Sequence, residues 1–108
     1  MKIFDMHVHA RTNGFDPQSL LHTMEKAGVS GACVISAPPE EHPIEILGGG
    51  LSFEARLDAV LNAAKGYEDR IFPVLWVHPN EENIIEKVRI AAKAGIAGFK
   101  MICSGYYV

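Results

Sequence analysis

The sequence is poor in cysteine and contains no long apolar segment. Its two cysteines, Cys33 and Cys103, lie far apart, and neither belongs to a Cys-x-x-Cys pair. This usage is typical of free, buried thiols in a reducing cytoplasm. No apolar run approaches the ~20 residues that span a bilayer, and the opening MKIFD, with one base and an early acid, does not resemble a signal peptide. We therefore expect a cytoplasmic protein without membrane contact.

Positive charge is also scarce. The 10 lysines and arginines are outnumbered by 13 acidic residues, and the formal net charge of −3 argues against a nucleic-acid-binding surface. A hydrophobic share of 48% against a charged share of 21% indicates a folded chain rather than a disordered one. A length of 108 residues suffices for one small domain, which we expect to span residues 1–108.

Short apolar runs alternate with helical patterns along the chain. The clearest helix start is Asp16-Pro17, an N-cap followed by a proline in the first turn, and Gly28 is a typical stop. Ser52 is expected to cap a second helix and Asn80 a third. The expected strands are 3–9, 31–36, 71–77 and 97–103, with helices between them and a long loop at 37–50 before the second helix.

Two patterns predict which side chains are buried. The run 71–77 is nearly all apolar, which suits a parallel strand covered on both faces, and we expect Leu75 and Val77 on its inward face. We expect Glu81 and Glu82 to complement the N-terminal dipole of the third helix. The expected buried side of that helix consists of Ile84, Ile85, Val88 and Ala92.

The predicted element order is β-α-β-α-β-α-β, which places the chain in the α/β class. Strict alternation favours a parallel sheet with right-handed crossovers, as found in barrels and in doubly wound sheets. A complete (β/α)₈ barrel needs roughly 250 residues, so in a barrel these units would form less than half, with two open sheet edges.

A polar motif closes the first predicted strand. Side chains alternate along a strand, so we expect Asp5, His7 and His9 to point to one face. Two imidazoles two residues apart can bind one metal ion, and a nearby carboxylate can orient them or act as a further ligand. The alternative is a partly buried strand with two incidental histidines; the Asp and the βαβ context favour the metal site.

The motif Asp5-x-His7-x-His9 resembles the signature of the amidohydrolase superfamily. Later segments resemble its amidohydrolase-related branch (family 2): residues 26–35 at the second strand, 72–79 at the third and 98–101 at the fourth. The resemblance implies the N-terminal half of a TIM-type (β/α)₈ barrel with its site at the carboxyl ends of the strands. It also implies a metal-dependent hydrolase in which a metal-activated water attacks an amide, ester or related bond of a small-molecule substrate.

The resemblance also implies roles for individual residues. His7 and His9 would bind the metal, most simply zinc, although two imidazoles also suit manganese and iron. The remaining ligands of the family lie on the fifth, sixth and eighth strands, so we expect residues 1–108 alone to be inactive. Lys100 would be a carbamylated bridge in a two-metal member or a substrate-anion ligand in a single-metal member, and the branch resembled favours the latter.

Further candidates follow the strands. His78 follows the third strand and either contacts substrate or acts as an ordinary loop histidine; together with Lys100 it is a candidate catalytic residue. Tyr106 follows the fourth strand and is a candidate substrate-binding residue. His42 lies in the long loop, where we expect a solvated side chain.

Other functions fit parts of the same pattern. Some members of the branch are metal-dependent decarboxylases. A phosphoesterase of the polymerase-and-histidinol-phosphatase type also opens with His-x-His, but its second strand usually ends in Thr-Asp-His, whereas this one ends in Ser36-Ala37-Pro38. A non-catalytic half-barrel would pair with a second copy through its open edges, and we expect a homo-oligomer.

Overall fold

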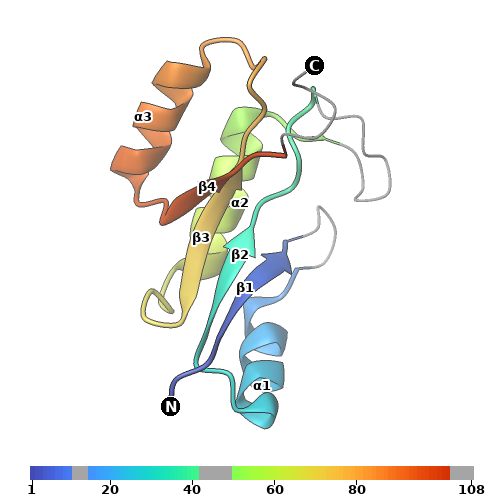
Figure 1. Ribbon diagram of the computed structural model, residues 1–108, viewed down its shortest axis with the longest axis vertical. Coiled ribbons are helices and arrows are strands. Elements are labelled where there is room, and N and C mark those ends of the chain that lie inside the picture. The colour runs from blue at the N-terminus through green and yellow to red at the C-terminus, as the bar shows by residue number, and fades with distance from the viewer. Residues whose placement is uncertain (11–14, 42–49, 103–108) are drawn as a thin grey trace.

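The computed structural model describes residues 1–10, 15–41 and 50–102. Four parallel strands form one sheet in the order β1-β2-β3-β4, and helices connect them (Figure 1). The predicted α/β fold with strict alternation is confirmed. The elements are β1 (Phe4–His9), α1 (Pro17–Ala27), β2 (Gly31–Ile35), α2 (Phe53–Ala64), β3 (Ile71–Trp76), α3 (Ile84–Ala94) and β4 (Gly98–Lys100).

Local capping sets the start of the first two helices, as predicted. The Asp16 carboxylate accepts a hydrogen bond of 3.1 Å from the Gln18 backbone N–H, and α1 ends at Gly28 with a φ of 72°. Such a left-handed conformation suits glycine because it has no Cβ. Ser52 Oγ accepts a hydrogen bond of 3.2 Å from Ala55 N–H at the start of α2. These contacts need only neighbouring residues, which is why the sequence pattern predicts them.

The core lies between the helices and one face of the sheet. Leu21 and Met24 of α1 and Val60 of α2 pack against Val34 and Ile71 of the sheet. A second cluster joins α2, β3 and α3, and its buried members are Phe53, Leu57, Leu75, Val77 and Ala91. One face of the sheet is therefore covered by helices, the arrangement of an outer barrel wall.

The opposite face, which we call the open face, carries apolar side chains in contact with solvent. Phe4 and Met6 of β1 are 45% and 68% exposed. The ring of Phe4 lies 6.0 Å from that of Phe72, and Cys33 Sγ donates to Met6 Sδ at 3.8 Å. Cys33 is free and half-buried rather than fully buried as expected. In a closed barrel this face would be the interior.

The predicted inward direction of Leu75 and Val77 is wrong. Both are buried, at 0% and 3% exposure, against α2 and α3 on the helix-covered face. The two faces of β3 are almost equally apolar, so its composition does not indicate which residues face the helices and which face the other side of the sheet. Trp76 instead has the opposite orientation and lies beside the His9 ring.

The start and the buried face of α3 also differ from expectation. The helix begins after Asn83, whose φ is 55°, and not after Asn80. Ala91 is its buried residue. Of the predicted buried side, Ile84 packs against the same cluster and Val88 is half-buried, whereas Ile85 is 68% exposed and Ala92 is also exposed. Glu81, in the turn before the helix, pairs with Arg56 of α2, and α3 begins after this turn.

The fourth strand is shorter than the expected 97–103, and Cys103 lies outside the described residues. Within the described ranges, no helix is long and apolar enough to cross a membrane.

Candidate metal centre at the carboxyl ends of the strands

Three nitrogen atoms from opposite ends of the sequence meet where the strands end. His7 Nε2 and His9 Nε2 are 2.8 Å apart, and Lys100 Nζ lies 3.4 Å from the first and 3.3 Å from the second. His9 is the last residue of β1 and Lys100 the last of β4, the two outer strands of the sheet. We call His7, His9 and Lys100 the nitrogen cluster. The curvature of the sheet brings its edges together on the open face.

Trp76 forms the floor of the nitrogen cluster. Its ring centroid lies 5.6 Å from that of His9, and Lys100 Nζ lies 4.2 Å above the Trp76 ring. A cation over an indole face is stabilised by the quadrupole of the ring. Trp76 is 1% exposed, so it gives the polar cluster a rigid apolar base.

Partial burial alters the electrostatics of Lys100. Desolvation lowers the pKa of its ammonium group from the ordinary lysine value. The contacts among His7 Nε2, His9 Nε2 and Lys100 Nζ are within hydrogen-bond distance, and which nitrogen donates in each depends on the ring tautomers. The cluster therefore combines two imidazoles with a lysine whose charged form is destabilised by burial.

The Asp5 side chain contacts the backbone of β1 at His7, the first residue of the nitrogen cluster. Its Oδ1 accepts a hydrogen bond of 3.0 Å from the His7 backbone N–H. The pairing register of β1 with β2 shifts between Asp5 and Val8, so an irregularity interrupts the strict alternation assumed from the sequence. His7 and His9 nevertheless converge, as predicted. The place of Asp5 as an orienting group or further ligand stays a prediction.

The geometry of the imidazole pair fits a divalent metal. Two nitrogens bound to one zinc ion at about 2.0–2.1 Å and a tetrahedral angle lie roughly 3.3 Å apart. The observed separation is 2.8 Å, shorter than that value, and His7 is exposed. In the described part of the chain, no group of three or more His, Cys, Asp or Glu side chains is placed to hold a metal ion. The chain's described contribution is thus two imidazoles and a lysine.

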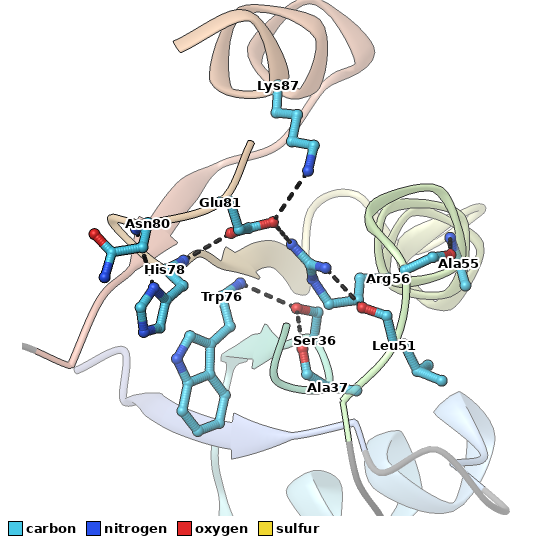
Figure 2. A network of polar contacts seen from close by, with 11 residues as sticks. Ser36, Ala37, Leu51, Ala55, Arg56, Trp76, His78, Asn80, Glu81 and Lys87 are labelled. Carbon is cyan, nitrogen blue, oxygen red and sulfur yellow. Dashed lines mark hydrogen bonds and ion pairs between the residues drawn. The ribbon is translucent and has the colours of Figure 1, made fainter. Parts of the chain in front are cut away.

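A second polar cluster lies buried behind the same strand ends (Figure 2). Arg56 of α2 donates to Glu81 Oε1 at 2.6 Å, and both side chains are about 1% exposed. Arg56 also donates to the Leu51 carbonyl at 2.7 Å, while Glu81 Oε2 accepts from the His78 backbone N–H at 2.7 Å. Lys87 Nζ approaches Glu81 Oε1 at 3.7 Å from a more exposed position. We call Arg56, Glu81 and His78 the ion-pair cluster.

The ion-pair cluster overturns the dipole role expected for Glu81. That role required a carboxylate in the first turn of a helix starting near Asn80, but Glu81 lies before α3 and faces α2. Sequence reasoning also missed Arg56 entirely. The sequence did contain a signal of this buried arginine, because Arg56 directly precedes Leu57, a residue of the apolar stripe of α2. Nothing local pairs it with a glutamate 25 positions away.

His78 is more enclosed than a solvated loop histidine. It is 4% exposed, and its Nδ1 accepts a hydrogen bond of 3.0 Å from the Asn80 backbone N–H. Figure 2 shows its ring projecting from the end of β3 on the same side as the Trp76 indole. The structure thus places His78 just after the end of β3, while its contact with a substrate stays a prediction.

Ser36 ties the ends of β2 and β3 together. Its Oγ accepts from Trp76 N–H at 3.0 Å and donates to the Ala37 carbonyl at 2.9 Å. This buried hydroxyl satisfies a backbone donor that the sheet leaves unpaired at the point where Trp76 begins to support His9.

A cavity lies beside the strand ends without including the nitrogen cluster. This space of about 320 Å³ lies between α1, α2 and the ends of β1 and β2. Its lining includes Ala10, Ser36 and Arg56 but none of the nitrogen-cluster residues. We therefore place the candidate chemistry at the nitrogen cluster and not in this cavity, because the cavity lacks a comparable convergence of ligating atoms. His42 and Tyr106 lie outside the described residues.

One solved structure provides a comparison. A crystal structure described as an amidohydrolase II superposes with a TM-score of 0.70 at 17% identity, covering 93% of this chain and 40% of that chain. No family model and no curated protein matches this chain. The likeness shows the fold, which is that of part of a TIM-type barrel. The chain spans less than half the length of that structure.

Proposed function

We propose that this chain provides the first-strand metal ligands of a metal-dependent hydrolase of the amidohydrolase type. The observation that carries the proposal is the convergence of His7 Nε2, His9 Nε2 and Lys100 Nζ at the strand ends. Active sites of barrel enzymes lie at this end of the strands. The fold shared with an amidohydrolase II structure supports the same reaction class.

His7 and His9 would hold the metal, with Asp5 orienting the strand through the His7 backbone N–H. A bound divalent ion would supply an activated water for attack on an amide, ester or related bond of a small molecule. Trp76 excludes water from one side of the cluster, and Lys100 offers a positive charge to an anionic substrate group. His78 and Tyr106 are the proposed substrate contacts.

Zinc is the proposed metal because neutral imidazole is among its preferred ligands. Manganese and iron are the alternatives, since imidazole also binds these ions. With two imidazoles from this chain, binding by residues 1–108 should be weak compared with a closed zinc site of four protein ligands.

Metal binding tests the proposal directly. Equilibrium dialysis against zinc should show about one ion bound per chain, and His7→Ala and the His7→Ala, His9→Ala double variant should abolish that binding. His22→Ala is the matched control, because His22 is exposed on α1 and away from the cluster. Equal zinc content in the wild type and the double variant would rule out this site.

We further propose a cytoplasmic protein that self-associates. The exposed Phe4 and Met6 of the open face support self-association, because large exposed apolar side chains favour contact with another surface. Sedimentation velocity across a concentration series is the test. A monomer at all concentrations would contradict it.

A further inference from the structure

The cavity between α1, α2 and the ends of β1 and β2 is too large to be filled by a single bridging water. Its volume is about 320 Å³, whereas one water molecule occupies about 30 Å³ in the liquid. Pockets that bind small molecules begin at about 300 Å³. The cavity therefore has the size of a small-molecule site, and the metal chemistry proposed for the nitrogen cluster does not use it.

The lining of this cavity is mostly apolar. Of its ten lining residues, seven are alanine, leucine, phenylalanine or proline, and the three polar ones are Ser36, Arg56 and Asn62. Among the described lining residues there is no aspartate, glutamate or lysine. A ligand that matches this lining has a small apolar body and few polar atoms, because polar groups buried without partners cost free energy.

Two of the three polar side chains are occupied or exposed. Ser36 Oγ already accepts from the Trp76 backbone N–H and donates to the Ala37 carbonyl. Asn62 is exposed on α2, so water can satisfy its amide. Arg56 is thus the polar residue that decides which ligand atom the buried part of the cavity suits.

Arg56 has one buried donor that the described protein does not use. Its two terminal nitrogens donate to the Leu51 carbonyl and to Glu81 Oε1. Its Nε–H is also buried, but within residues 1–10, 15–41 and 50–102 no atom accepts from it. A buried donor without an acceptor is costly, so it favours a ligand that supplies one. Figure 2 shows Arg56 extending from α2 toward Ser36 and Ala37, which line the same cavity.

We propose that this cavity binds a small uncharged molecule whose carbonyl oxygen accepts a hydrogen bond from Arg56 Nε–H. A carbonyl fits because the arginine side chain donates and cannot accept. An uncharged ligand fits because Glu81 already compensates the guanidinium, and a carboxylate would bury a further charge without a partner. The apolar body of the ligand lies against Leu51 and Ala63. The inference does not depend on the proposed metal site, because the cavity excludes the nitrogen cluster.

Isobutyramide, isobutyrate and isobutylamine test the ligand class, because they have similar apolar bodies and differ at the polar end. Each is titrated into the ¹⁵N-labelled chain while the Arg56 Nε–H resonance is followed. Isobutyramide should shift this resonance to saturation, and the carboxylate and the amine should bind about tenfold more weakly or less. An Nε–H resonance that isobutyramide leaves unchanged would mean that the cavity holds water only and would overturn the proposal. Equal binding of the carboxylate or the amine would also overturn it.

The location of the ligand is tested on α2. Ala59 is exposed and lines the cavity, so Ala59→Leu reduces the space and should weaken isobutyramide about tenfold. Ala55→Leu is the matched control, because Ala55 is exposed on the same helix and does not line the cavity. This control should bind isobutyramide as the wild type does. Unchanged affinity in Ala59→Leu would place isobutyramide outside the cavity and contradict the proposal.

The donor is tested by Arg56→Met with Glu81→Leu, which removes Nε–H together with both charges and leaves no buried charge unpaired. Isobutyramide should bind about two- to tenfold more weakly, the effect of one lost hydrogen bond. Arg70→Met with Glu25→Leu removes a more exposed ion pair and should bind normally. A folded Arg56/Glu81 variant with wild-type affinity would overturn the donor role. If circular dichroism shows that this variant does not fold, the wild-type titration and Ala59→Leu decide the proposal.

Discussion

The nitrogen cluster and the ion-pair cluster lie at the same strand ends but differ in the exposure and the pairing of their polar groups. In the nitrogen cluster, His7 is exposed, His9 and Lys100 are half-buried, and the contacts are among nitrogen atoms. In the ion-pair cluster, Arg56 and Glu81 are almost fully buried and meet as opposite charges. The nitrogen cluster has accessible nitrogen atoms that can bind a metal ion or a substrate. The charges of the ion-pair cluster are compensated within the protein.

This difference distinguishes residues suited to binding a ligand from residues that hold the surrounding structure in place. A metal or substrate gains free energy by satisfying groups that the folded protein leaves accessible, so the nitrogen cluster is suited to binding. A buried pair holds its geometry because displacement would leave a charge uncompensated. The variants below weaken one cluster at a time.

The largest expected effect is on catalysis. A chain extended by four further βα units should hydrolyse a substrate among a panel of amides, esters and lactones with zinc or manganese, because the proposed hydrolase requires further metal ligands and a base from such units. His9→Ala in that longer chain should abolish the activity, and residues 1–108 alone should show none. Turnover by the short chain that survives chelation and His7→Ala would show that the chemistry lies outside the nitrogen cluster.

The next effect concerns the stability of the ion-pair cluster. Glu81→Leu alone should reduce the free energy of unfolding by about 3–5 kcal/mol, since it leaves the Arg56 guanidinium buried without its partner. Adding Arg56→Met should restore most of that loss. Urea denaturation followed by circular dichroism measures both. His7→Ala, at an exposed position, should change stability by less than about 0.5 kcal/mol.

A smaller effect is expected at Lys100. Lys100→Met should strengthen zinc binding about tenfold at pH 7, because it removes an ammonium that repels the metal by roughly 1.4 kcal/mol after screening. The pKa of Lys100 is lowered by desolvation, so its charge is present at low pH and is lost as pH rises through that lowered value. The difference between wild type and variant should therefore shrink as pH rises. Weaker zinc binding in Lys100→Met would instead make the lysine a metal ligand.

The smallest effect concerns the open face. Burial, and secondarily the charge of Asp5, raise the pKa of the Cys33 thiol. In a chain carrying Cys103→Ser, alkylation of Cys33 at pH 8 should be slower than that of an exposed cysteine, because less thiolate is present. Asp5→Asn should accelerate it, because removing the nearby negative charge takes away one of the two causes that raise the thiol pKa. An unchanged rate would show that the Asp5 charge does not affect the pKa of the Cys33 thiol.

Local patterns predicted the parts of the fold that depend on neighbouring residues. Asp16, Ser52 and Gly28 act within one helical turn, and their roles are confirmed. The convergence of His7 and His9 was also predictable, since both lie on one strand two residues apart. The metal role of the pair stays a prediction, as does the substrate role of His78.

The errors share one cause. The direction of Leu75 and Val77, the start of α3 and the partner of Glu81 all depend on residues distant in sequence. The sequence of an apolar strand does not indicate which of its faces packs against the helices. The sequence around a glutamate near a helix start does not indicate that an arginine on another helix will pair with it.

The sequence by itself determined the alternation of strands and helices, the caps of α1 and α2, and the placement of two imidazoles at the end of β1. These features follow from φ/ψ preferences, side-chain hydrogen bonds and spacing over a few residues. Only the tertiary structure decided that Lys100 joins those imidazoles and that Arg56 meets Glu81 beneath His78. Sheet curvature and helix packing bring these distant residues together, and their free energy depends on burial that no local pattern contains.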